Sequence, residues 1–168
     1  MKIVGIIPCR YQSTRFPGKS LALINGKPMM WHVYQRALES NMLDEVYIAT
    51  DDERIVEVAN KHSLNTIMTS DKHETGTDRV AEAASQLQAD YFVNIQGDEP
   101  FIDPEAIKLV VQAIIDCDNP LVQAANAYTS MQEVSDVIDT NMVKVIMDVN
   151  QRAIAYSRHA IPFPKANS

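Results

Sequence analysis

The chain has 168 residues, of which 46% are hydrophobic and 22% charged, and its formal net charge is −7 at pH 7. This length allows a substantial core, and the acidic balance argues against a general nucleic-acid-binding protein. Cys9 and Cys117 lie far apart without metal-ligand spacing, which argues against a disulfide scaffold and for a reducing compartment. No apolar run approaches the length of a spanning helix, so the sequence predicts a soluble, cytoplasmic protein without membrane insertion.

Apolar runs alternate with segments of helical periodicity along the chain. The runs predict strands over 2–8, 45–50, 65–69 and 90–96, and the periodic segments predict helices over 28–40, 53–62, 78–87 and 105–116. Further strands are predicted over 121–128, 142–148 and 153–158. This alternation is typical of an α/β fold with a mostly parallel central sheet flanked by helices.

Polar clusters follow each of the first four predicted strands, over 8–19, 50–52, 69–79 and 96–99. Parallel α/β sheets bind their ligands at the carboxyl ends of their strands. Because these ends meet at one edge of the sheet, a single ligand can contact all four clusters.

The first cluster contains "IIPCRYQSTRFPGK", in which Arg10, Arg15 and Lys19 lie within ten residues. The segment has neither the G-x-G-x-x-G pattern of a dinucleotide-binding turn nor more than the tail of a Walker A loop. Backbone amides near Ser13 and Thr14, together with the three cations, can surround a triphosphate. The alternative is a surface loop whose cations are merely solvated.

The second cluster is "NIQGDEP", where Asp98 and Glu99 directly follow a predicted strand. A carboxylate at this position is a natural ligand for Mg²⁺, which takes one or two carboxylates together with substrate phosphates. Gly97 is expected to let the backbone turn sharply toward the cleft. Alternatively, Asp98 caps the helix that begins near Pro104, or "GDEP" is an ordinary turn.

The third cluster is "HETGTDR", residues 73–79. As a functional segment it would contact the base and the sugar of a nucleotide. Alternatively, Thr77 or Asp78 caps the following helix and Arg79 is a solvated helical residue. His73 is interpreted as structural or exposed rather than as a general base.

Six segments, in chain order, resemble the 3-deoxy-manno-octulosonate (Kdo) cytidylyltransferases, also called CMP-Kdo synthetases. They are "IIPCRYQSTRFPGKSL", "INGKPMMWHV", "ATDDERI", "HETGTDR", "NIQGDEP" and "AYSRHAIPF". The matches run from residue 3 to about residue 164. The first and fifth segments are shared with the CMP-sialic acid synthetases, whereas "GTDR" and "SR-x-x-IP" are more specific to the Kdo enzymes.

The resemblance implies a Rossmann-like nucleotidyltransferase that converts CTP and Kdo to CMP-Kdo and pyrophosphate for lipopolysaccharide assembly. It implies Mg²⁺ as cofactor, CTP and Kdo as substrates, and a homodimer when full length. Residues 1–168 would form a single nucleotidyltransferase domain, the amino-terminal portion of a longer enzyme. Family members continue further, and that part supplies a second metal-binding aspartate, more sugar contacts and much of the dimer interface.

The resemblance also assigns roles to particular residues. Lys19 and Arg15 would stabilise the departing phosphates, and Asp98 would bind the metal, so these three are the expected catalytic residues. The expected substrate-binding residues are Arg10 and Ser13 in the CTP loop, Thr77 and Arg79 in the nucleotide and sugar pocket, Gln96 near the sugar acid, and Ser157 and Arg158 on the Kdo side.

One departure from the family pattern is Cys9, which stands where the loop usually carries an alanine. An exposed thiolate there would make the loop oxidisable. Three alternatives stay open: a cytidylyltransferase for another acidic sugar, such as 8-amino-Kdo or a sialic acid; a non-catalytic CTP-binding module; and an NAD-type oxidoreductase. The missing G-x-G-x-x-G disfavours the last of these.

Overall fold

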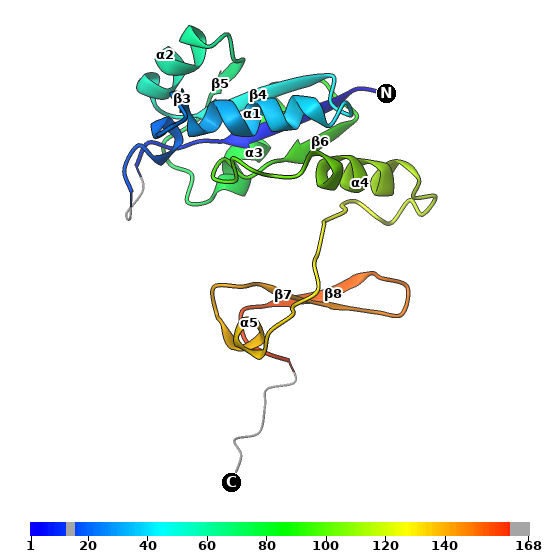
Figure 1. The fold of residues 1–168 in the computed structure, drawn as a ribbon. Helices are drawn as coiled ribbons and strands as arrows, with labels where there is room; N and C mark the ends of the chain where they lie inside the picture. The colour runs from blue at the N-terminus through cyan, green and yellow to red at the C-terminus, as the bar shows by residue number, and fades with distance from the viewer. Residues whose placement is uncertain (13–15, 162–168) are drawn as a thin grey trace. The chain divides into compact units, whose positions relative to one another are not determined.

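The computed structural model describes residues 1–12 and 16–161, and the chain divides into two compact units, Met1–Ala125 and Asn126–Ser168 (Figure 1). That residues 1–168 form one nucleotidyltransferase domain stays a prediction. Within the described ranges, every helix is too short or too polar to cross a membrane.

A four-stranded sheet forms the centre of the first unit (Figure 1). Its strands lie in the order β5-β4-β1-β6, and each pairs in parallel with its neighbours. The predicted parallel α/β fold is therefore confirmed. The bounds of the strands are Ile3–Pro8 for β1, Glu45–Thr50 for β4, Thr66–Met68 for β5 and Tyr91–Asn94 for β6.

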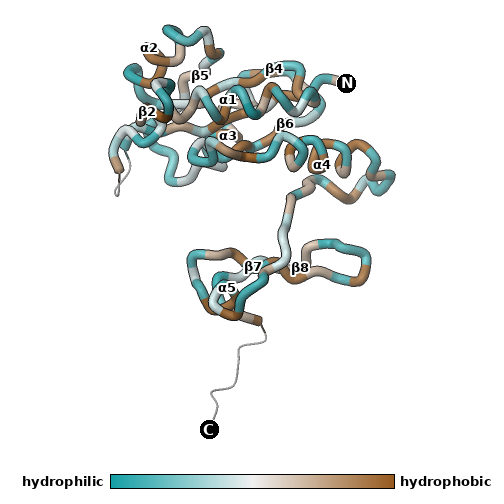
Figure 2. Tube along the Cα trace, in the orientation of Figure 1, coloured by the Kyte–Doolittle hydropathy of each residue, from teal (hydrophilic) through white to brown (hydrophobic). Residues whose placement is uncertain are grey.

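Helices cover both faces of this sheet because the central strand β1 is apolar on both sides. Ile3 and Ile7 pack in the cluster that includes residues of α1, α2 and α4, whereas Val4 and Ile6 pack with α3. Figure 2 shows hydrophobic and hydrophilic residues alternating around α1 and α4. The helices are α1 (Met29–Glu39), α2 (Glu53–Lys61), α3 (Gly76–Ser85) and α4 (Pro104–Ile115).

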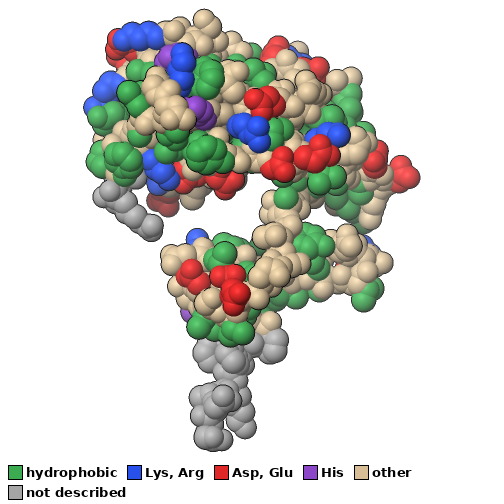
Figure 3. All heavy atoms as spheres, in the orientation of Figure 1, with side chains coloured by type: hydrophobic (Ala, Val, Ile, Leu, Met, Phe, Trp, Pro, Cys, Tyr) green, Lys and Arg blue, Asp and Glu red, His purple; other side chains and the backbone are tan. Residues whose placement is uncertain are grey.

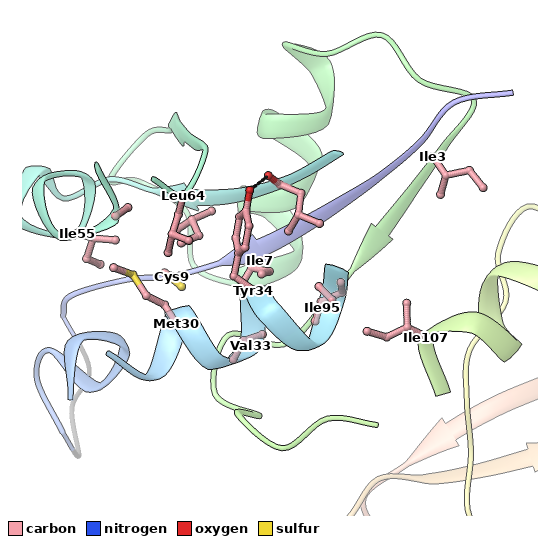
Figure 4. Packing of buried hydrophobic residues seen from close by; sticks show 14 of the residues in the cluster. Ile3, Ile7, Cys9, Met30, Val33, Tyr34, Ile55, Leu64, Ile95 and Ile107 are labelled. Carbon is pink, nitrogen blue, oxygen red and sulfur yellow. Dashed lines mark hydrogen bonds between the residues drawn. The ribbon is translucent and has the colours of Figure 1, made fainter. Parts of the chain in front are cut away.

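The larger cluster of buried side chains is shown in Figure 4. The Tyr34 ring is buried in it, and its hydroxyl donates to the Val46 carbonyl at 2.9 Å. Cys9 belongs to the same cluster, at the point where β1 ends. The core therefore reaches the edge at which the predicted ligand site lies.

The helix caps agree only partly with the predictions from sequence. Asp52 caps α2 by accepting a hydrogen bond from the Arg54 amide at 2.9 Å. The cap of α3 is Thr75, which exchanges hydrogen bonds with Asp78 in a capping box, so the prediction of Thr77 or Asp78 as the cap was wrong.

At the start of α4, Asp103 is the cap and Pro104 occupies the first helical turn, as its position in the sequence suggested. Asp98 therefore does not cap this helix. Its carboxylate makes a different contact, with Lys19.

Short elements connect β1 to α1. A 3-10 helix, η1, spans Lys19–Leu21, and the strands β2 (Leu23–Ile24) and β3 (Lys27–Pro28) form a hairpin. Asn25 and Gly26 form its two-residue turn with φ values of 49° and 76°. Asn-Gly is the sequence that this left-handed turn favours.

The second unit contains α5 (Val134–Ile138) and an antiparallel hairpin of β7 (Lys144–Met147) and β8 (Ala153–Ser157), which confirms the last two predicted strands. The strand predicted over 121–128 was wrong, because the described chain forms no regular element there. This segment crosses the boundary between the units and is mostly exposed. An apolar run becomes a strand only where a neighbouring strand pairs with its backbone.

Candidate functional site

The four polar clusters predicted from the sequence share one edge of the sheet, because all four strands run in the same direction. Among the described residues, two ion pairs connect the clusters to one another. The Lys19 ammonium lies 2.9 Å from an Asp98 carboxylate oxygen, and the Arg79 guanidinium lies 3.0 Å from an Asp51 carboxylate oxygen. The edge therefore combines cationic and acidic groups from segments far apart in the sequence.

The Lys19–Asp98 pair is open to solvent. The exposed fractions of its side chains are 39% for Lys19 and 57% for Asp98. An ion pair this exposed contributes only about 0–1 kcal/mol to stability. The pair can therefore separate at little cost when a ligand with its own charges binds.

Gly97 brings the turn that carries Asp98 against the end of β1. A Cβ atom at Gly97 would lie 2.5 Å from the Pro8 carbonyl oxygen and 3.1 Å from the Cys9 sulfur. Gly97 and Asp98 lie in a turn, as the sequence predicts, but the φ of Gly97 is not positive, so a left-handed conformation is not the reason for glycine here. Glycine is needed because the two backbones approach too closely for any side chain.

Arg79 is buried, with 3% of its surface exposed, so the alternative of a solvated helical residue was wrong. One guanidinium nitrogen donates to the Thr69 hydroxyl and the Ser70 carbonyl, and another donates to Asp51. The side chain joins the segments after β4 and β5 to α3. Its role in binding substrate stays a prediction.

The Cys9 thiol is 3% exposed, and burial raises its pKa from 9.0 to about 12, a rise that the positive charge of Arg79 partly opposes. A thiol with this pKa is protonated at neutral pH and unreactive. The expectation of an exposed, oxidisable thiolate was therefore wrong.

His73 has a structural partner, in keeping with its interpretation. Its Nε2 atom contacts the Glu82 carboxylate, which also accepts a hydrogen bond from the Ser70 amide at 2.8 Å. The Ser70 amide and then His73 lower the pKa of Glu82. These contacts hold the segment after β5 against α3.

The other predicted site residues are distributed as follows. Arg10, Thr77 and Gln96 have exposed side chains in the first unit, and Ser13 and Arg15 lie outside the described residues. Ser157 and Arg158 belong to the second unit. Figure 3 shows basic and acidic side chains interspersed on the visible face of the first unit.

The second unit contains a buried cation that the sequence reasoning missed. Lys144 is 9% exposed, and its ammonium donates to the backbone carbonyls of Asp139, Met142 and Arg158. The Arg158 guanidinium donates in turn to the carbonyls of Thr140 and Asn141. The only available signal was a lysine at the start of an apolar strand, which does not reveal its partners.

Asp98 and Glu99 are the exposed carboxylates of the acidic turn. Among residues 1–12 and 16–161, no three or more His, Cys, Asp or Glu side chains form a group that could hold a metal ion. Mg²⁺ commonly takes one or two protein carboxylates together with phosphate oxygens of a nucleotide.

The parallel sheet, its flanking helices and the polar strand ends define a Rossmann-like fold of the nucleotidyltransferase type. Residues 4–168 match the family described as cytidylyltransferase, and the chain belongs to that family.

The chain is 45% identical to 3-deoxy-manno-octulosonate cytidylyltransferase of Trichlorobacter lovleyi and 44% identical to that of Geobacter sulfurreducens, in each case over 97% of this chain and 64% of the relative. A solved structure of CMP:2-keto-3-deoxy-manno-octonic acid synthetase complexed with CTP matches 99% of this chain and 68% of that one, with 37% identity and a TM-score of 0.86. These matches confirm the resemblance inferred from the motifs. The chain spans about 64% of the length of the curated relatives.

Proposed function

We propose that this chain carries the CTP-binding site of an enzyme that joins CTP and Kdo to give CMP-Kdo and pyrophosphate, for lipopolysaccharide synthesis. The observation that carries the proposal is the Lys19–Asp98 pair at the carboxyl edge of the sheet. The names of the relatives and the CTP complex of the similar structure support it. A cytoplasmic location and a homodimer when full length belong to this proposal through the family resemblance.

The charges at the edge suit phosphate transfer, in which the anomeric hydroxyl of Kdo attacks the α-phosphorus of CTP and pyrophosphate leaves. Lys19 and Arg15 would stabilise the negative charge on the departing phosphates, and Arg10 and Ser13 would bind the triphosphate. Lys19 can turn from Asp98 to a phosphate because the ion pair is exposed. No nucleophilic side chain is needed, since positioning and fixed charges supply the catalysis.

Asp98 would hold Mg²⁺ with the help of phosphate oxygens. Its carboxylate is 57% exposed and already faces a cation, so a metal can replace the Lys19 ammonium as its partner. Mg²⁺ bound there would neutralise phosphate charge and lower the pKa of a coordinated hydroxyl. Gly97 holds the Asp98 turn against the end of β1.

The family resemblance assigns Gln96, Ser157 and Arg158 to the sugar acid. Gln96 lies two residues before Asp98, on the turn where the hydroxyl must approach the phosphorus. Arg158 would pair with the Kdo carboxylate, with Ser157 beside it. Thr77 and Arg79 would line the nucleotide and sugar pocket.

Pyrophosphate release from CTP and Mg²⁺, measured with and without Kdo, tests the reaction, and calorimetric titration with CTP tests binding. Lys19→Ala should lower kcat/KM for CTP by about 100-fold. The matched control is Lys61→Ala, which removes a 65% exposed lysine paired with Glu57 at the end of α2. Unchanged turnover and CTP affinity in the Lys19 variant would contradict the assignment.

The metal assignment has its own test. Asp98→Asn should abolish Mg²⁺-dependent release, while Asp118→Asn, at another exposed aspartate, should leave it unchanged. Full Mg²⁺-dependent activity in the Asp98 variant would place the metal elsewhere.

Two alternatives give different results in the same assays. An enzyme for another acidic sugar would release pyrophosphate with 8-amino-Kdo or a sialic acid but not with Kdo. A binding module would bind CTP without release with any of these sugars.

A further inference from the structure

The Tyr11 ring, just after the end of β1, stacks against the Arg54 guanidinium, a cation that has no role in the proposed reaction. The guanidinium carbon of Arg54 lies 3.3 Å from the centroid of this ring. A stacked arginine over a tyrosine is attractive because the ring face is negative. The contact joins the first turn of α2 to the segment that leads toward Lys19.

The orientation of the Arg54 guanidinium is set by Asp52. Two of its nitrogens lie 2.8 and 2.6 Å from the two carboxylate oxygens of Asp52. The same carboxylate caps α2 by accepting from the Arg54 amide. The guanidinium plane is thus held by a forked pair at a helix terminus, so it offers Tyr11 a fixed surface.

Tyr11 in turn contacts Gly18, the residue before Lys19. The Gly18 amide donates to the Tyr11 carbonyl at 2.7 Å. The φ of Gly18 is 70°, and a Cβ atom there would lie 3.1 Å from a carbon of the Tyr11 ring. A continuous series of contacts therefore runs from Asp52 through Arg54, Tyr11 and Gly18 to Lys19.

Tyr11 packs against the larger core cluster, but the Arg54 end of this series contributes little to the core. The Arg54 side chain is 57% exposed, and its charge is already balanced by Asp52. Losing it should therefore leave the unit folded. The series of contacts constrains the backbone at Lys19, from which the cationic side chain extends. Phosphate binding depends on how well such cations are held in the binding geometry before the ligand arrives.

We propose that Arg54, acting through Tyr11, is a positioning residue that holds Gly18 and Lys19 in the geometry that binds the CTP triphosphate. This inference rests on the proposed function. Nε and Nη2 of Arg54 already donate to Asp52, so we assign Arg54 to positioning rather than to phosphate contact.

The test compares Arg54→Ala, Tyr11→Leu and Tyr11→Phe by calorimetric titration with CTP and Mg²⁺ and by pyrophosphate release. Arg54→Ala and Tyr11→Leu should each weaken CTP binding about three- to tenfold, whereas Tyr11→Phe, which keeps the ring, should stay within about twofold of the unchanged chain. The double variant, Arg54→Ala with Tyr11→Leu, should bind CTP no more weakly than the single variant that has the lower CTP affinity. KM for CTP should rise and kcat should fall, because Lys19 is also an expected catalytic residue, while KM for Kdo should stay unchanged.

Arg152→Ala is the matched control, because Arg152 forms an Asp148–arginine pair and is similarly exposed at 61%. Amide hydrogen exchange at Gly18 without nucleotide is the second readout, and it should speed up about tenfold in Arg54→Ala but not in Arg152→Ala. The proposal would be overturned if Arg54→Ala left either the CTP affinity or the exchange rate of the Gly18 amide unchanged. Failure of the unchanged chain to bind CTP would instead count against the proposed function, and the Gly18 exchange would still decide whether Arg54 positions this segment.

Discussion

Replacing Asp51 with asparagine should destabilise the first unit strongly, because it leaves a buried arginine without its counter-ion. Arg79 is 3% exposed, the Asp51 side chain is 20% exposed, and their charged groups are 3.0 Å apart. Removing one partner of a fully buried pair costs roughly 3–5 kcal/mol. Arg79 would keep its bonds to Thr69 and Ser70, and Asp51 is partly solvated, so we expect a loss of about 2 kcal/mol.

Urea unfolding followed by circular dichroism at pH 7 measures this loss as a shift of the midpoint at constant slope. Glu57→Gln is the control, because it removes a carboxylate from the Glu57–Lys61 pair, whose side chains are 68% and 65% exposed. The unfolding free energy of this variant should change by less than about 0.5 kcal/mol. A second variant, Asp51→Asn with Arg79→Met, should recover part of the lost stability because no buried charge remains. If Asp51→Asn were as stable as the unchanged chain, the argument from the buried pair would be wrong.

Four further predictions follow from other contacts. Gly97→Ala should cost about 1–3 kcal/mol and weaken CTP–Mg²⁺ binding, since its Cβ would meet the Pro8 carbonyl at 2.5 Å; an unchanged melting temperature would contradict this. A thiol reagent at pH 8 should modify Cys117 in the folded chain, and buried Cys9 only after the chain unfolds. Rapid modification of both thiols in the folded chain would contradict the burial of Cys9. Because the folded pKa of Cys9, about 12, exceeds its ordinary 9.0, stability should fall as pH rises from about 9 to 12, and Cys9→Ala should lack this part of the fall. Lys144→Met removes a donor from three carbonyls, of which, in the described part of the chain, only that of Asp139 keeps another, the Met142 amide, so β7–β8 should lose about 2 kcal/mol of protection from hydrogen exchange; unchanged protection would count against it.

Local patterns in the sequence were sufficient for most of the fold. Continuous apolar runs such as Ile3–Pro8 predicted strands buried on both faces, and helical periodicity predicted α1 to α4. The shared edge of the site followed as well, because parallel strands must end together. These inferences succeeded because each depends on residues close in sequence or on a rule of sheet geometry.

Local patterns failed where a residue's role depends on a distant partner. The run over 121–128 has the composition of a strand, yet it has no regular structure in the described chain, because composition does not supply a pairing neighbour. Thr75, rather than Thr77 or Asp78, caps α3, since several polar residues in a row can each satisfy the helix terminus.

The sequence by itself determined which elements form and which polar clusters meet at the edge of the sheet, since hydrophobic periodicity and strand direction carry that information. Only the tertiary structure decided what each polar group does there. Arg79 is buried because Asp51 and Thr69 come to it from other strand ends, and Gly97 must be glycine because the end of β1 passes against it. Such roles arise from contacts between segments far apart in the chain, where the energy of a charge or the room for a side chain depends on its surroundings.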